Sequence, residues 1–599
     1  MAPQEKITFI SGKLYYKVFL AGASKILENQ GLLNKINVFP VPDADTGTNL
    51  ASTIRAIIDK AHPHESFRIT SGAIASAALS GARGNSGIIF AQFLYGVSLE
   101  AGNREKLSIE TFAEVMNNAV GYIYDAIAEP LEGTMLTVIR EWAEFIYAQK
   151  NTIDDFINLF IKAYEIASRS LSETTEKLKA LKIANVVDAG AKGFVLFLEG
   201  VIEGFKKNMT LREIIVNRGQ TGTNSLASIP HDEFNFRYCC ETLIKADHMD
   251  LAKLKMSIRG IGDSLVVAGS DKFARVHLHT DSPHLLFEKL REYGTLSYQK
   301  VDDMLKQNQA ATDRRWKIAL VTDSTCDLPE ELTDKYQIYV IPLNIHFGEN
   351  QYLDKLTLNT DQFFRLIDKE KNFPTTSQPG EMNFQNLYSL LTTYYDSVIS
   401  VHISKKFSGT WQNSKRAAEK ISKETGKKIS VLDSMHVSGS LGMLTLKVAQ
   451  AIEKGISHDE IVSSFPEWRN NTRIYVSVKN LKYMVRGGRV SATRGFMARL
   501  LNVKPIVSMD SEGRSALFDR AFSQRSNMKK VLDHTGKFLE NKKLWNYIIL
   551  HAEGEETAQW YADRLFKMTG KRPVSIQNIS PVIGLSAGKG TAALALLAE

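Results

Sequence analysis

The pattern of apolar residues changes twice along this 599-residue chain, so no single core built from one type of secondary structure fits all of it. Residues 1–208 predict helices almost throughout, because apolar side chains recur there at helical spacing. Examples are Tyr16, Phe19, Leu20, Ala23 and Leu27. Turn sequences rich in glycine, proline and aspartate separate these predicted helices. A polar stretch at 219–233 follows and has the composition of a linker.

The rest of the chain mixes strands with helices. Residues 234–306 predict short elements of both kinds, including a hairpin of 263–269 and 274–280. A second polar stretch, 306–315, leads into a block in which β-rich runs alternate with helices. That alternation favours βαβ units with a mainly parallel sheet. We therefore expect a multidomain protein whose domains are residues 1–215, 230–308 and 316–599.

Composition excludes several classes of protein. A hydrophobic content of 44% is too high for a mainly disordered chain, and three cysteines are too few for a disulfide scaffold. No run approaches 18 apolar residues, so we expect no membrane span. The start, MAPQEKITFI, lacks the apolar core of a secretory signal. Together these features predict a cytoplasmic protein.

The charge pattern gives a weaker indication. A net charge of +8 is modest for this length and is not concentrated in a tail, so nucleic acid is not an expected partner. The stretch Arg473–Arg499 contains seven basic residues and no acidic one. It forms either a solvated face or a surface for phosphate or an acidic partner.

The segment Asn37–Asn49, NVFPVPDADTGTN, is the most informative in the chain. Its two prolines and its glycine prevent a regular helix across it. Asp43 and Asp45 stand two residues apart, and in an extended turn their carboxylates can converge on one hard cation such as Mg²⁺. The alternative is an ordinary aspartate-rich turn that caps a helix.

Glycine-rich loops suit an anion. The loop Gly81–Gly87, GARGNSG, precedes an apolar run, and glycine lets backbone N–H groups approach a phosphate at a helix N-terminus. This signal is weak by itself. Together with the aspartate turn, EGTMLT at 132–137 and VVDAGAKG at 186–193, it predicts four loops that line one nucleotide site.

Residues 8–208 closely resemble the DhaL-type (DAK2) kinase domain of bacterial fatty acid kinases. The strings NVFPVPDADTGTN, ARGNSGIIFAQFL, EGTMLTVIR and VVDAGAKGF carry the resemblance. It implies an all-α eight-helix barrel that binds ATP and Mg²⁺ at one end, with Asp43 and Asp45 as catalytic metal ligands. The residues that it implies near the nucleotide are Thr46, Thr48, Asn49, Asn85, Ser86, Gly87, Thr134, Met135, Asp188 and Gly190. Dihydroxyacetone-type relatives have a third carboxylate upstream, in the neighbourhood of Asn37 here.

Cys239, Cys240, His277 and His279 are candidate metal ligands. The two histidines are two residues apart on a predicted strand and so face the same side, and thiolate with imidazole suits Zn²⁺. The alternative is a partly buried cysteine beside two hydrogen-bonded histidines. The block resembles the small α+β middle domain of fatty acid kinases through RYCCE, GDSLVVAG and VHLHTDSP. That resemblance implies a structural zinc at Cys239, His277 and His279.

Two hydroxyl-rich loops, Thr375–Gly380 and Lys406–Trp411, follow or flank predicted strands of the last block, where ligands bind in open α/β sheets. Their hydroxyl and N–H groups suit a carboxylate or phosphate, and the alternative is capping and turn chemistry.

Residues 317–599 resemble the DegV family of fatty-acid-binding proteins. The strings VTDSTCDLP, TTSQPG, ISKKFSGTWQNS, VLDSMHVSGSLG and MVRGGRVS carry this resemblance. It implies a two-lobed α/β fold with an acyl chain buried in a tunnel. It also implies carboxylate contacts from Thr376, Ser377, Ser408 and Gly409, and a catalytic role for Arg489 in phosphotransfer.

The chain departs from the DegV pattern at one loop. Family members usually carry a histidine beside the carboxylate or phosphate, and here Ser586 replaces it while Lys589 replaces a proline. Ser586 thus joins the expected fatty-acid contacts, and Lys589 is a candidate for the lost cationic contact. The string GLSAGKGT is not a P-loop, because only three residues separate its first glycine from the GK pair where four are needed.

These features predict an ATP-dependent kinase that converts a fatty acid carboxylate to an acyl phosphate while the DegV-like domain holds the acyl chain. Two alternatives stay open: a DhaL-type kinase for another small acceptor, and a nucleotide-sensing, lipid-binding or regulatory protein without turnover. We expect ATP, Mg²⁺ and a fatty acid as ligands, zinc as a structural ion and a homodimer as the assembly. A transient contact with a membrane or an acyl-transfer enzyme also stays open.

Overall fold

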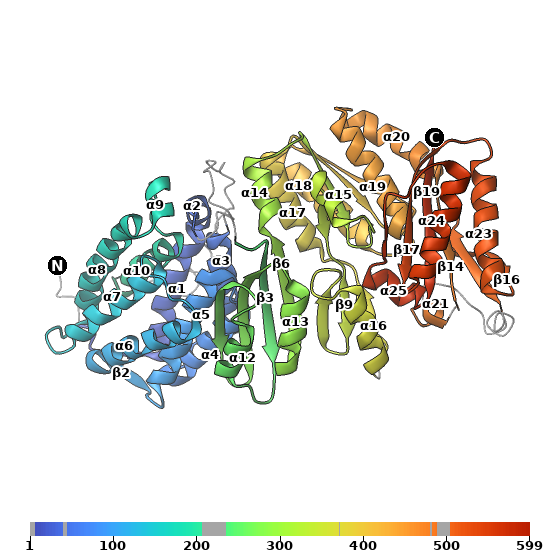
Figure 1. Ribbon diagram of the computed structural model, residues 1–599. Coiled ribbons are helices and arrows are strands. Elements are labelled where there is room, and N and C mark those ends of the chain that lie inside the picture. Colours follow the sequence, from blue (N-terminus) through green and yellow to red (C-terminus); the bar gives the residue numbers. More distant parts are fainter. Residues whose placement is uncertain (1–5, 40–44, 207–234, 371, 480–481, 488–502) are drawn as a thin grey trace. The chain divides into compact units, whose positions relative to one another are not determined.

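The computed structural model describes residues 6–39, 45–206, 235–370, 372–479, 482–487 and 503–599. The chain divides into two compact units, Met1–Asn308 and Gln309–Glu599. The first unit contains a helical region and a four-stranded sheet, and the second contains three sheets with flanking helices (Figure 1).

The helical region has ten helices in the part that the structure describes. They are α1 (Gly12–Glu28), α2 (Gln30–Lys35), α3 (Thr46–Lys60), α4 (Phe67–Gly81), α5 (Gly84–Ala101), α6 (Ile109–Ala126), α7 (Met135–Ala148), α8 (Phe156–Lys177), α9 (Lys179–Ala184) and α10 (Ala189–Lys206). Two short antiparallel strands, β1 (Phe9–Ser11) and β2 (Lys106–Ser108), run into α1 and α6. Ser11 and Ser108 end these strands and cap the two helices, because each hydroxyl accepts a hydrogen bond from an amide of the first turn.

Glycines allow α1 and α10 to pack closely. A Cβ on Gly200 would lie 2.3 Å from the carbonyl oxygen of Ala21, and a Cβ on Gly22 would lie 2.5 Å from the Phe197 ring. Any larger residue at either position would force the two helices apart.

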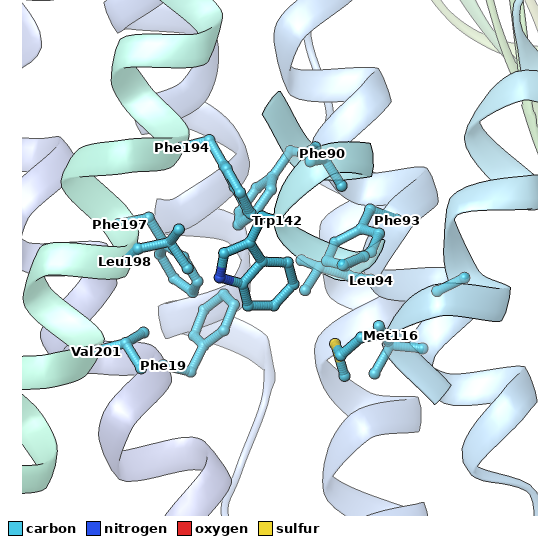
Figure 2. Close-up of a cluster of buried hydrophobic side chains, with 14 of the residues drawn as sticks. Phe19, Phe90, Phe93, Leu94, Met116, Trp142, Phe194, Phe197, Leu198 and Val201 are labelled. Carbon is cyan, nitrogen blue, oxygen red and sulfur yellow. The ribbon is translucent and has the colours of Figure 1, made fainter. Parts of the chain in front are cut away.

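Aromatic side chains fill the interior between the helices. Trp142 is surrounded by them, and its ring centroid lies 5.5 Å from that of Phe194 and 6.3 Å from that of Phe93, both in edge contact (Figure 2). Phe19 and Phe90 each lie 5.2 Å from Phe197 in the same way. Because side chains occupy this interior, polar ligands are left to the loops at the helix ends.

The sheet of the first unit is antiparallel throughout, in the order β4-β5-β3-β6. Its strands are β3 (Tyr238–Lys245), β4 (Asp263–Gly269), β5 (Phe273–Thr280) and β6 (Thr295–Asp303), and its helices are α12 (Leu251–Ile258), α13 (Pro283–Leu290), a 3-10 turn (Arg291–Tyr293) and α14 (Met304–Thr312). The predicted hairpin is present as β4 and β5. Alternation gives the sheet one face with the apolar residues Cys240, Ile244 and Leu278 and one face that carries charge.

The second unit begins with a parallel sheet and a small antiparallel one. The parallel sheet has the order β13-β12-β7-β8 and the small sheet the order β10-β9-β11. Their strands are β7 (Ile318–Asp323), β8 (Tyr339–Ile341), β9 (Asn344–Phe347), β10 (Asn350–Leu353), β11 (Thr375–Ser377), β12 (Ser397–His402) and β13 (Lys428–Asp433). The helices among them are α15 (Glu330–Lys335), α16 (Thr360–Lys369), α17 (Glu381–Tyr394) and α18 (Thr410–Thr425).

A six-stranded mixed sheet, in the order β16-β15-β14-β19-β17-β18, completes the second unit. Its strands are β14 (Thr472–Ser477), β15 (Lys504–Met509), β16 (Ser515–Ala521), β17 (Leu544–Ala552), β18 (Ile576–Asn578) and β19 (Thr591–Ala598). Its helices are α19 (Ser438–Glu453), α20 (His458–Asn470), α21 (Lys482–Arg486), α23 (Gln524–Leu539), α24 (Glu555–Thr569) and α25 (Pro581–Ala587).

The prediction of a mainly parallel sheet is right for only one of these sheets. In the six-stranded sheet only β17 and β18 pair in parallel, and the other neighbours are antiparallel. A run of β-branched and apolar residues predicts a strand but not the direction of its partner, which depends on the connections. Within the described ranges, no helix is both long and apolar enough to cross a bilayer.

Candidate functional sites

Four polar loops of the helical region meet where α3, α5, α7 and α10 begin. In the first, Asp45 precedes α3 and its carboxylate accepts a 2.7 Å hydrogen bond from the side-chain amide of Asn49. The hydroxyl of Thr46 donates to Oδ1 of Asn37 over 2.8 Å. Asn37 is therefore part of the same turn as Asp45.

The glycine loop before α5 lies directly against this turn. Gly84 has a φ of +58°, and a Cβ there would lie 2.2 Å from Nδ2 of Asn49, so the position requires glycine. A Cβ on Gly87 would lie 3.3 Å from the backbone oxygen of Asn49. Oδ1 of Asn85 is buried and has no hydrogen-bond partner among the described residues. A buried acceptor left free at the start of a helix fits a bound cation or ligand donor.

Asp188 joins the two remaining loops. Its Oδ1 accepts hydrogen bonds from the amides of Met135, at 3.1 Å, and Ala191, at 2.7 Å. Burial raises the pKa of this carboxyl to about 6. A Cβ on Gly190 would lie 2.7 Å from Oγ of Ser86, so the loop of α10 touches the loop of α5. The structure thus brings the predicted loops together, and their contact with a nucleotide stays a prediction.

Two predicted residues make other local contacts. The hydroxyl of Thr48 accepts hydrogen bonds from Gln30, at 3.2 Å, and Asn34, at 3.0 Å, and so faces α2. Thr134 caps α7 by accepting from the amide of Leu136. Asp43 and Arg489 lie outside the described residues.

One face of the middle sheet gathers metal-ligating and charged groups. Strand pairing places Cys239 opposite His279 and Glu241 opposite His277, all on the same face. Ligand atoms of Cys239, His277 and His279 lie within 4.8 Å of one another. Cys240 lies between Cys239 and Glu241 on the opposite face and is not part of this group.

The three side chains fit a zinc ion. The Nε2 atoms of His277 and His279 are 3.3 Å apart, which matches the separation of about 3.3 Å for two nitrogens at about 2.05 Å from a tetrahedral Zn²⁺. Nδ1 of His279 lies 3.4 Å from Asp263 and Nδ1 of His277 lies 3.7 Å from Glu241, and carboxylates in such places orient metal-bound imidazoles. Burial lowers the pKa of His279 and raises that of the Cys239 thiol. Metal binding would therefore use a neutral imidazole and displace the thiol proton.

Glu241 is a residue of this region that the sequence analysis missed. Its side chain is 1% exposed, and Oε1 accepts a 2.7 Å hydrogen bond from the amide of Gly84 in the helical region. Burial alone would raise its pKa, but the neighbouring His277 and the charges of Lys300 and Arg275 hold it at about 2. The string RYCCE contains the signal, since Glu241 stands two residues after the candidate ligand and shares its face.

The second unit contains an apolar cavity on one face of the six-stranded sheet. Alternate residues line it, Ile474 and Val476 from β14 and Thr591 and Ala593 from β19. The residues between them pack on the other face against α23 and α24. The remaining lining residues are Phe407, Val437, Ser438, Val478, Met484, Val507, Ser508, Met509, Ser515, Ile579, Ile583, Ser586 and Ala587. None of the lining residues carries a charge.

The two hydroxyl-rich loops lie side by side. A Cβ on Gly409 would lie 3.0 Å from Nε2 of Gln378, and Asn413 donates a 2.8 Å hydrogen bond to the carbonyl of Pro379. Phe407 lines the cavity and Ser408 follows it in the chain. The loops are therefore adjacent to each other and connected to the cavity wall.

The predicted head-group residues make local contacts outside the cavity lining. The Ser408 hydroxyl lies 2.8 Å from that of Thr410, and the Ser377 hydroxyl lies 3.0 Å from Nε2 of His346. Thr376 pairs with Ile345 in the small sheet. Ser377, Ser408, Thr376 and Gly409, all described residues, are not among those that line the cavity.

Ser586 lines the cavity, whereas the charge of Lys589 is engaged elsewhere. A Cβ on Gly487 would lie 3.4 Å from Oγ of Ser586, so the serine lies beside Gly487, which stands two residues before Arg489 in the sequence. The Lys589 ammonium pairs with Asp368 at 2.7 Å and with Glu553 at 3.3 Å. These ion pairs argue against Lys589 as the replacement for the lost cationic contact.

A buried chain of hydrogen bonds in the parallel sheet has the order of a hydrolase triad. Nδ1 of His402 lies 3.0 Å from Asp323 and Nε2 lies 2.7 Å from the hydroxyl of Ser400. All three residues are fully buried, and the Ser400 hydroxyl also accepts from Tyr388. A nucleophile sealed in this way cannot reach a substrate, so the arrangement stabilises the sheet.

Three family models match consecutive parts of the chain. Residues 40–203 match the DAK2 domain, 235–311 the FakA-like middle domain of fatty acid kinases, and 317–599 the DegV family, which is described as uncharacterised. The chain is a DAK2–DegV fusion protein.

The fusion protein also matches curated proteins. An uncharacterised protein of Mycoplasma genitalium is 32% identical over 429 residues, which are 64% of the fusion protein and 77% of that relative, and the two belong to one family. An uncharacterised protein of Staphylococcus epidermidis is 31% identical over 317 residues. That match covers 51% of the fusion protein and 57% of the relative, so the fusion protein spans little more than half of the relative's length.

A solved structure, a fatty acid-binding DegV family protein of Thermus thermophilus, is 28% identical to the fusion protein. The match covers 47% of the fusion protein and all of that chain, with a TM-score of 0.44.

Proposed function

We propose that the fusion protein is an ATP-dependent kinase that phosphorylates a fatty acid carboxylate to an acyl phosphate, with the acyl chain held by the DegV domain. The proposal depends on one observation, the presence in one chain of four clustered phosphate-type loops and of an uncharged apolar cavity. The match to the FakA-like middle domain of fatty acid kinases supports the choice of acceptor. We take the helical region to be the eight-helix barrel that the DhaL resemblance implies.

In this proposal the loops at the starts of α3, α5, α7 and α10 hold the nucleotide. Asp45, together with Asp43, supplies carboxylates to Mg²⁺, and Asn85 offers its free buried oxygen. When bound, Mg²⁺ would neutralise negative charge on the phosphates. The backbone amides of the first turn of α5 face the phosphates, where the helix dipole favours negative charge. Asp188 fixes the relative placement of the α7 and α10 loops through its two amide contacts.

The cavity of the DegV domain suits an acyl chain. Each methylene buried against its apolar wall contributes about 0.8 kcal/mol, and the absence of charge among the lining residues disfavours polar metabolites. Hydroxyl and amide groups of Thr376, Ser377, Ser408 and Gly409, with Ser586 at the wall, would hold the carboxylate. Arg489 would supply positive charge where the phosphoryl group is transferred.

We further propose a structural zinc at Cys239, His277 and His279. Protein purified without added metal should contain about one zinc per chain, and Cys239→Ala should lose it. Zinc-free parent protein that is fully folded at neutral pH would show that these residues only pack.

The decisive assay traps acyl phosphate as its hydroxamate, with ATP and Mg²⁺ in excess and a series of saturated and unsaturated fatty acids. Hydroxamate that depends on both ATP and fatty acid supports the proposal. ATP consumption that another acceptor stimulates, without hydroxamate, would identify a kinase for that acceptor. Nucleotide and lipid binding without any turnover would identify a sensor. Light scattering of the purified protein tests the expected homodimer.

A further inference from the structure

We propose that Glu241 and Arg275 of the middle domain clamp the glycine loop between α4 and α5 and so position it for nucleotide binding. Neither residue would contact the nucleotide, and both act through the loop. The inference rests on the proposed function only in assuming that a nucleotide phosphate binds at the start of α5.

The two side chains bind the two ends of the same loop. Oε1 of Glu241 accepts a 2.7 Å hydrogen bond from the amide of Gly84, the first residue of α5. Nη2 of Arg275 donates a 2.7 Å hydrogen bond to the carbonyl of Ser80, in the last turn of α4. Only three residues separate these two backbone groups, so the clamp spans the whole turn.

The signs of the two charges match the ends that they bind. A helix C-terminus favours a cation and a helix N-terminus favours an anion. Arg275 meets the C-terminal end of α4, and Glu241 meets the N-terminal end of α5. The residue before α5, Arg83, makes no side-chain cap, so Glu241 takes over the capping role from another domain.

Both clamp residues are deeply buried. Glu241 is 1% exposed and Arg275 is 4% exposed, and they lie on adjacent strands of one sheet. The Arg275 guanidinium also lies 5.1 Å from the centre of the Tyr298 ring. Strands position side chains more firmly than loops do, so the middle domain supplies a template to which the loop is fixed.

The loop needs such support because its geometry is demanding. Gly84 has a positive φ, and a Cβ there would lie 2.2 Å from Nδ2 of Asn49. The next three residues, Asn85, Ser86 and Gly87, carry the amides that face the proposed phosphates. A loop fixed beforehand binds its ligand more tightly, because less conformational entropy is lost on binding.

The test uses the full chain and two measurements. One is the affinity for a non-hydrolysable ATP analogue with Mg²⁺ by calorimetry, and the other is backbone hydrogen exchange of residues 80–88 without nucleotide. Glu241→Ala should weaken analogue binding by about tenfold and speed exchange in the loop. Glu241→Gln retains an acceptor for the Gly84 amide. Its analogue affinity and its loop exchange should therefore lie closer to the parent values than those of Glu241→Ala do.

Gln92→Ala is the matched control. Oε1 of Gln92 accepts a 3.2 Å hydrogen bond from the amide of Gly269, so this variant also removes one bond between α5 and the middle sheet, two turns further along the helix. Its analogue affinity and its exchange in residues 80–88 should match the parent. Arg275→Met removes the other half of the clamp and should speed exchange in the same peptide, which keeps the test valid if Glu241→Ala does not fold.

Two failures can be told apart. In the first case the parent binds the analogue, and Glu241→Ala has the same analogue affinity, the same exchange in residues 80–88 and the same zinc content as Gln92→Ala. The clamp proposal would then be wrong, and the kinase proposal would stand. If the parent itself does not bind the analogue, the proposed function is wrong and the positioning role falls with it. Weaker binding that appears only together with zinc loss would also overturn the clamp, because it would assign the effect to the metal site.

Discussion

The four clustered loops of the DAK2 domain and the cavity of the DegV domain differ in the charge that they carry, since Asp45 and Asp188 belong to the loops and none of the described residues that line the cavity is charged. In the loops, Oδ1 of Asn85 is buried without a partner among the described residues. In the cavity wall, the hydroxyl of Ser508 donates to the carbonyl of Ile474 and that of Thr591 to the carbonyl of Ala587. The hydroxyl of Ser515 in the same wall is buried and has no partner in the described structure.

This contrast separates the two tasks of the proposed reaction. A site that keeps charged groups is suited to phosphate and metal, and a site whose lining carries no charge is suited to an apolar chain. Changes of charge should therefore impair phosphoryl transfer alone, and changes of volume should impair acyl binding alone.

The largest expected effect is that of Asp45→Asn. The substitution preserves size and hydrogen bonding but removes charge at the proposed Mg²⁺ site, and electrostatic effects of this kind change rates by about 10²–10³. The hydroxamate assay should show this loss, and Asp43→Asn should behave in the same way. Fatty acid affinity should not change, and turnover within a few-fold of the parent would refute the metal assignment. An aspartate that only caps the turn would instead lower the melting temperature and leave turnover nearly normal.

A smaller effect is expected from filling the cavity. Ala593→Phe places a ring where β19 meets the apolar space and should weaken fatty acid binding by roughly 100-fold, because overpacking and lost acyl burial act together. Fluorescence titration with a labelled fatty acid measures this change. The smaller Ala593→Val should have a partial effect, and the affinity for the ATP analogue should not change in either variant. Equal lipid affinity in all three proteins would place the acyl chain elsewhere.

The next largest effect is expected for the hydroxyls that we propose to hold the fatty acid carboxylate. Ser408→Ala or Thr376→Ala should each weaken fatty acid binding by roughly 10- to 100-fold, because each removes a hydrogen bond to a carboxylate. The exposed Thr393 provides the control, since Thr393→Ala removes a hydroxyl of α17 that belongs to neither loop and donates to the carbonyl of Ser389. An affinity in both test variants equal to that of the control would end the head-group assignment.

The smallest effect concerns buried aspartates, which both domains contain. Asp354 of the DegV domain is fully buried, accepts hydrogen bonds from Ser324 and the amide of Val582, and has its pKa raised by burial to about 7. A raised pKa means that the folded state holds a proton that the unfolded state has released, so stability falls as pH rises. Between pH 6 and pH 8 this group should lower the free energy of unfolding by roughly 1 kcal/mol, and Asp188, whose pKa is raised less, should lower it by less.

Denaturant titrations at both pH values, without nucleotide or metal, measure these slopes. Asp354→Asn should remove most of the pH dependence of the DegV domain, since the amide resembles the protonated acid. An unchanged slope in that variant would show that other groups titrate.

Local sequence predicts much of this protein because some features depend on neighbouring residues alone. Helical spacing within 1–208 predicts helices that the structure contains, and alternation predicts that His277 and His279 share a strand face. The apolar runs of the last block likewise predict strands β14 and β17. Each of these follows from the period of one element.

Only the tertiary structure decides which elements meet. The direction of pairing in the six-stranded sheet follows from long connections, and the ion pairs of Lys589 include one with a residue more than 200 positions away. Glu241 and Gly84 are 157 positions apart, and neither segment indicates that the other is its partner. Their contact exists because the charged face of one sheet packs against the loop between two helices. The free energy of such packing depends on the whole surface that is buried and not on any local sequence pattern.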